Sequence, residues 1–93
     1  MSATLDDDVF DLAVRTLNYA IEFANTGGYA SLRLTDILGG ILGVALQMEG
    51  VSHKELYREA KERIEERDLL AGGEEKSKFL DELLMMFIEE WRK

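Results

Sequence analysis

The chain has 93 residues, with 19 acidic and 11 basic side chains and a formal charge of −8 at pH 7. This length suits one domain with a single hydrophobic core, and the negative charge disfavours binding to nucleic acid or anionic lipid. Cysteine is absent, which excludes disulfides, thiolate metal sites and cysteine catalysis. Since the N-terminal stretch is acidic and the apolar runs are short, we expect a cytoplasmic protein with no membrane contact.

Apolar periodicity predicts a first helix over residues 5–25. Its apolar face comprises Val9, Leu12, Ala13, Leu17, Ala20, Ile21 and Ala24. Asp6, Asp7 and Asp8 fall in its first turn, where carboxylates meet the positive end of the helix dipole. We therefore interpret these aspartates as helix-start residues and not as metal ligands.

A second helix is predicted over residues 36–49, after an ordered link of about nine residues from residue 27. Thr35 or Asp36 would cap its start, and Gly50 would end it. The apolar residues of the link, among them Tyr29 and Leu34, are expected to pack against the helices.

Three glycines, Gly39, Gly40 and Gly43, lie inside this second helix. Each costs about 1 kcal/mol relative to alanine, so close packing must compensate. One explanation is that the first or last helix crosses there and brings Leu17 or Phe87 against the glycines. Another is that two copies of the helix meet across a two-fold axis. A third is a ligand that needs access to the backbone.

The third and fourth helices are predicted over residues 53–69 and 74–92. The sequence from Ser52 to Glu55 has the capping-box pattern, which would start the third helix. The apolar stripe of the third helix is Leu56, Tyr57, Ala60 and Ile64, and charged residues surround it. This charged face could bind a basic protein partner.

The fourth helix has more apolar residues than one contact inside the chain would bury. Those expected to face inward are Phe79, Leu80, Leu83, Leu84, Phe87, Ile88 and Trp91, and Met85 and Met86 widen the face. This excess favours self-association. Four helices with short links predict an all-α, compact four-helix bundle that forms a homodimer.

Candidate polar residues are few. His53, the only histidine, is expected at the surface in the first turn of the third helix. Glu22 is expected to form an internal ion pair with Arg33. The acidic residues of the third helix alternate with basic ones on one solvated face, so we expect neither a metal nor another cofactor.

The passage NTGGYASLRLTDILGGIL, residues 25–42, resembles a segment of a small all-helical family of bacterial and archaeal proteins. That family is described only as a domain of unknown function. The matching positions are Tyr29, Arg33 and Leu34, and the resemblance spans about the first half of the chain. It implies a small all-helical fold and no activity.

These observations predict a non-catalytic protein-interaction or homodimerisation module. Its expected contact residues are Gly39, Gly40, Gly43, Met86, Phe87 and Trp91. The alternative is a helical ligand-binding protein or metal-dependent enzyme with a site built at a subunit interface. The polar residues available for that site are Glu22, Tyr29, Arg33, Asp36 and His53.

Overall fold

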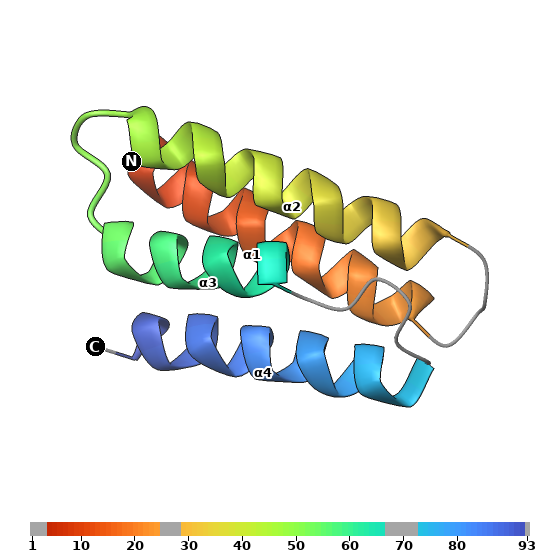
Figure 1. The fold of residues 1–93 in the computed structure, drawn as a ribbon. Coiled ribbons are helices and arrows are strands. Elements are labelled where there is room, and N and C mark those ends of the chain that lie inside the picture. Colours follow the sequence, from red (N-terminus) through yellow and green to blue (C-terminus); the bar gives the residue numbers. More distant parts are fainter. Residues whose placement is uncertain (1–3, 25–28, 67–72, 93) are drawn as a thin grey trace.

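The computed structural model describes residues 4–24, 29–66 and 73–92, which contain four α-helices. They are α1 (Leu5–Phe23), α2 (Ala30–Gln47), α3 (Lys54–Glu66) and α4 (Gly73–Trp91). Each helix runs antiparallel to the one before it (Figure 1). Helix α1 packs against α2 and α4, and α3 packs against the same two helices. This up-and-down arrangement confirms the expected all-α four-helix fold.

One core lies between the four helices. Its fully buried members include Ala13, Leu17, Ala20, Leu38, Leu42, Tyr57, Ala60, Leu80 and Leu83. The predicted stripe on α3 is confirmed, because all four of its residues are buried. This agreement follows from the narrow stripe, which leaves α3 only one apolar face to bury.

Three residues predicted to pack in the protein are exposed instead, among them Tyr29, which is 70% exposed. Leu12 is 48% exposed, and Trp91 is 76% exposed. Phe10, which the apolar periodicity did not select, is buried instead, and its ring lies 5.6 Å from that of Phe87 on α4. The rotation of α1 about its own axis explains the difference, because α1 packs between α2 and α4 and turns Phe10 toward α4.

The first turn of α1 confirms the interpretation of Asp7 as a helix-start residue. The Thr4 hydroxyl accepts a hydrogen bond from the Asp7 N–H at 3.1 Å. In return, the Asp7 carboxylate accepts one from the Thr4 N–H at 3.4 Å. The pair forms a capping box, which satisfies two backbone donors that the helix itself leaves free.

Helix α2 begins at Ala30, so the expected link up to residue 35 and the expected start at residue 36 are wrong. The hydroxyl of Ser31 donates to the Ala20 carbonyl of α1 at 2.9 Å, and that of Thr35 donates to the Ser31 carbonyl at 2.8 Å. Both side chains are therefore buried with partners. Helix α1 ends at Phe23 with Ala24 as its C-cap, two residues before the predicted end at residue 25.

By length and composition alone, α2 could cross a membrane. Core helices of soluble proteins pass the same test. One face of α2 is buried inside the bundle, including Leu38, Leu42 and Ala45. The expected absence of membrane contact stays a prediction.

Helix α3 packs closely over two of the three glycines of α2. A Cβ at Gly39 would lie 3.4 Å from Ile64 Cγ2, and one at Gly43 would lie 3.3 Å from Lys61 Cε. The expectation that α1 or α4 crosses these glycines is therefore wrong. Their assignment to a contact between two copies stays a prediction, because both glycines remain only half-buried beside α3. A Cβ at Gly40 would have nothing within 4 Å, so no contact inside the described chain explains this glycine.

The close approach of α3 leads to a first prediction. Gly39→Leu should lower the free energy of unfolding by about 1–3 kcal/mol, because the larger side chain would push α3 away from α2. Gly40→Leu is the matched control, since it makes the same change one residue along where a Cβ meets open space. Urea denaturation in dilute solution measures the free energy of unfolding of both variants. Equal losses of stability would contradict the assignment of Gly39 to the α2–α3 contact.

Candidate functional site

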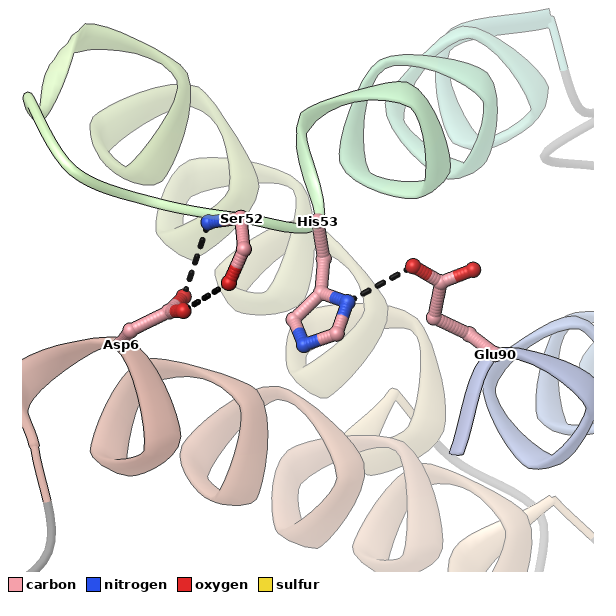
Figure 2. Close-up of polar contacts among 4 residues, drawn as sticks. All are labelled: Asp6, Ser52, His53 and Glu90. Atoms are coloured by element: carbon pink, nitrogen blue, oxygen red, sulfur yellow. Dashed lines mark hydrogen bonds and ion pairs between the residues drawn. The ribbon is translucent and has the colours of Figure 1, made fainter. Parts of the chain in front are cut away.

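The link between α2 and α3 is held against α1 by one carboxylate. Asp6 Oδ1 accepts a hydrogen bond from the Ser52 backbone N–H at 3.1 Å, and Asp6 Oδ2 accepts one from the Ser52 hydroxyl (Figure 2). The hydroxyl therefore does not cap α3 as the capping-box pattern predicted. That expectation is wrong because α3 begins at Lys54 and the His53 carbonyl accepts its first helical hydrogen bond, from the Tyr57 N–H, so Ser52 lies one residue before the cap position. Before Ser52, the backbone is already extended at Met48, so α2 ends at Gln47 and not at Gly50 as predicted. Gly50, with φ +80°, lies in the turn that follows.

The next residue of the link is held against α4. The Nδ1 atom of His53 lies 2.7 Å from Glu90 Oε2, and both side chains are mostly buried (Figure 2). The His53 ring also packs against Phe10, with ring centroids 4.9 Å apart. The expectation of a surface histidine is wrong, because α1 and α4 enclose His53 from two sides.

Two side chains near this junction have shifted pKa values. The hydrogen bond from the Ser52 hydroxyl lowers the pKa of Asp6 below its ordinary value of 3.8. Burial raises the pKa of Tyr57 to about 12, and the charges of Asp6 and Glu90 add to this rise. The Tyr57 hydroxyl is buried and has no hydrogen-bond partner among the residues that the structure describes.

A groove of about 720 Å³ opens beside His53, between α1 and α4. We call it the α1–α4 groove. Its apolar lining comprises Phe10, Val14, Leu84, Phe87, Ile88 and Trp91. Its polar lining comprises Asp7, Asp8, Asp11 and His53. The Trp91 ring stacks on Phe10 with centroids 5.9 Å apart, so it forms one end of the groove while staying exposed to solvent.

The lining has the chemistry of a binding site. Apolar side chains form most of the groove, and three aspartates add negative charge. Asp11 pairs with Arg15 at 2.5 Å, so part of that charge is already compensated. The arrangement can bind an apolar group that carries a positive charge nearby.

The described lining offers few groups that could act in catalysis. His53 and Glu90 can hold or transfer a proton at the imidazole. The lining contains no serine, cysteine or lysine that could act as a nucleophile. Across the described parts of the chain, no three histidine, aspartate or glutamate side chains are grouped to hold a metal ion.

The predicted polar cluster does not form within one chain. Glu22, Tyr29 and Arg33 lie where α1 passes into α2, and Asp36 lies one turn further along α2, whereas His53 lies toward the opposite end of the bundle (Figure 1). Glu22 and Arg33 are both exposed, and no ion pair joins them in the described structure. The expected internal ion pair is therefore wrong. A site that forms between two copies stays a prediction.

The predicted contact residues on α4 have three different environments. Phe87 is only 1% exposed and belongs to the core, where one side of its ring lines the groove. Met86 is half-buried, and Trp91 is exposed at the groove. Phe87 and Trp91 therefore share one surface, because both side chains line the groove.

The charged face of α3 is largely neutralised by its own ion pairs. Arg58 lies 3.1 Å from Glu55, and Arg63 lies 3.3 Å from Glu59. Lys61 pairs with Glu65. Exposed pairs of this kind contribute little stability, but they lower the net field available to a basic partner. The groove therefore offers a better defined acidic surface than α3.

Three residues of the site, Phe10, Asp6 and Glu90, were not predicted from the sequence. His53 and Glu90 are 37 residues apart, and Asp6 and Ser52 are 46 residues apart. No spacing rule for a helix connects such positions. For Phe10, the available signal was its size, since a large aromatic beside an apolar stripe competes for burial.

Comparisons with protein-family models, with curated proteins and with solved structures found no match to this chain. The resemblance of residues 25–42 to a helical family therefore stays a prediction.

The Asp6 contact leads to a prediction about acid stability. The lowered pKa means that ionised Asp6 stabilises the fold above pH 3.8, and that this stability is lost as the pH falls through the lower folded pKa. Asp6→Asn should lower the free energy of unfolding by about 1 kcal/mol at neutral pH, because the contact is open to solvent. The difference from the natural protein should shrink in strong acid.

Urea denaturation at neutral and at acid pH measures this effect. Asp8→Asn is the matched control, because it removes an equal charge from the same turn of α1 but lies outside the Ser52 contact. If Asp8→Asn reproduced the pH dependence of Asp6→Asn, the effect would come from the loss of one negative charge and not from the contact between Asp6 and Ser52.

The buried Tyr57 hydroxyl leads to a prediction of the opposite sign. Tyr57→Phe should raise the free energy of unfolding by about 1 kcal/mol, because it removes a buried polar group that lacks a partner in the described structure. Tyr29→Phe, at a tyrosine exposed to solvent, should change stability by less than about 0.5 kcal/mol. Thermal unfolding, followed by circular dichroism, compares the stability of the two variants with that of the natural protein. A clear loss of stability in Tyr57→Phe would show that the hydroxyl is satisfied in solution.

Proposed function

We propose that this protein is a non-catalytic interaction module whose α1–α4 groove binds a basic, apolar segment of another protein. The observation that supports this proposal is the groove itself, because it combines an apolar lining with aspartates in a volume of about 720 Å³. Such a volume accommodates several side chains of a peptide.

The apolar part of the groove supplies binding energy. Trp91 is 76% exposed, although its ring already packs on Phe10. An exposed tryptophan beside a hydrophobic groove is a favourable anchor, because covering it removes a large apolar area from water. A ligand that lies along the groove would bury Trp91 against its own apolar side chains.

The charge of the groove selects the ligand. Asp7 and Asp8 lie in the first turn of α1 and line the groove. The chain as a whole carries a charge of −8, so it attracts basic segments and repels acidic ones. A basic amphipathic segment therefore complements both the apolar lining and the acidic side chains.

A ligand-binding protein or enzyme with a site between subunits is the alternative function. The His53–Glu90 pair would be its natural proton-transfer group. We favour the interaction module because the groove lining lacks a nucleophile and because the other polar candidates lie away from His53 in the described chain.

The experiment is a titration with a designed amphipathic peptide of leucine and lysine, followed by the fluorescence of Trp91. Trp91 is the only tryptophan, so its emission reports on the groove directly. We expect a saturable blue shift that weakens at high salt. A peptide with glutamate in place of lysine should cause no shift. Equal responses to the two peptides, or no response to either, would contradict the proposal.

A matched pair of variants separates the groove from the general negative charge. Asp8→Asn and Asp81→Asn each remove one negative charge, but only Asp8 lines the groove. We expect the dissociation constant of the lysine peptide to rise roughly threefold to tenfold in Asp8→Asn and to stay nearly unchanged in Asp81→Asn. Similar effects in both variants would indicate non-specific attraction.

A further inference from the structure

We infer that a second copy of this chain packs on an apolar face formed by α1 and α2, on the flank of α1 that points away from the groove. This face, which we call the α1–α2 face, comprises Leu5, Leu12 and Tyr19 on α1 and Ile37, Gly40 and Val44 on α2. Its five larger side chains are each about half exposed or more. The inference rests on different residues from the proposed function and does not depend on it.

The residues of this face form one continuous surface. Phe10 and Val14 line the groove toward α4, and the 100° rotation per residue of a helix places Leu12 and Tyr19 on the opposite flank of α1, beside α2. On α2, Gly39 and Gly43 face α3, and the same geometry places Ile37 and Val44 on the other flank, beside α1. The two exposed strips therefore border the same α1–α2 contact.

The size of the face comes close to what a small dimer needs. At roughly 100 Å² for each half-exposed apolar side chain, the five larger residues expose roughly 500 Å². Half-buried apolar neighbours such as Leu34 and Ile41 add to this area. Stable interfaces bury about 600–1,000 Å² on each partner, and roughly 500 Å² lies in the upper part of the range of about 300–600 Å² that the largest apolar patch of a monomer covers.

The charge distribution favours a second copy as the occupant. Two chains of charge −8 repel each other, so they can meet only where charge is low. Within Ala30–Gln47, α2 carries one basic and one acidic residue, Arg33 and Asp36, and so has no net charge. By contrast, the first turn of α1 carries three aspartates. The α2 part of the face is therefore where two copies can approach with little repulsion.

Gly40 supplies an independent reason for this contact. A Cβ at this position would meet nothing within 4 Å in its own chain, so packing within the described bundle does not require glycine. Gly40 lies between Ile37 and Val44 on the exposed strip of α2. A second α2 that crosses there in the antiparallel direction could approach the backbone closely, with Ile37 of each copy near Val44 of the other.

Sedimentation equilibrium and light scattering test the inference on the full chain across a wide range of concentration. We expect a mass twice the 10.6 kDa of one chain. Val44→Glu should raise the dissociation constant of the dimer roughly 30-fold or more, because it places a charge in the interface. Gly40→Leu should weaken the dimer as well, while circular dichroism shows an intact helical fold.

Met85→Glu is the matched control. Met85 is 50% exposed on α4, and Val44 is 63% exposed on α2, so both variants place one glutamate at an exposed apolar helix position. Only Val44→Glu should change the dimer. A monomer at every concentration, or equal effects of the two variants, would overturn the inference. Flotation with neutral lipid vesicles that Val44→Glu abolishes, without any dimer, would assign the face to a membrane surface and would also overturn it.

Discussion

The short link between α2 and α3 is fixed from two sides, and much of the structure depends on it. Ser52 is bound to Asp6 of α1, and His53 is bound to Glu90 of α4 (Figure 2). The two contacts point in opposite directions from adjacent residues, so the link joins helices that are far apart in the sequence. They also hold His53 against Phe10, which sets the position of one end of the α1–α4 groove.

The same bundle has two chemically different surfaces. One flank of α1 meets α4 only loosely, and the groove there collects aspartates beside exposed Trp91. The other flank of α1 meets α2 closely, and an apolar face of low charge surrounds that contact. Phe10 and Val14 of the groove and Leu12 and Tyr19 of the α1–α2 face lie on different sides of α1, so the two proposed contacts use different side chains. The proposals therefore describe one interaction module with two separate contacts.

Most of the fold was predictable from local signals. The stripe from Leu56 to Ile64 predicted the buried face of α3, because only one side of that helix is apolar. Gly50 indicated a turn near the end of α2, where its positive φ favours glycine, but the helix itself ends three residues earlier at Gln47. The start of α2 was not predictable in this way. Ser31 and Thr35 look like link residues, and the helix can bury them because their hydroxyls find carbonyl partners, that of Ser31 on α1 and that of Thr35 within α2.

The sequence by itself determined the four-helix class, the acidic charge and the residues able to form an apolar surface, because periodicity and composition act over a few turns of chain. Only the tertiary structure decided which apolar residues remain exposed, since the choice between Leu12 and Phe10 depends on how α1 rotates between its two neighbours. It also decided the candidate site. Asp6, Ser52, His53 and Glu90 are ordinary polar residues in the sequence, and they meet because antiparallel packing brings the start of α1, the start of α3 and the end of α4 to the same end of the bundle (Figure 1).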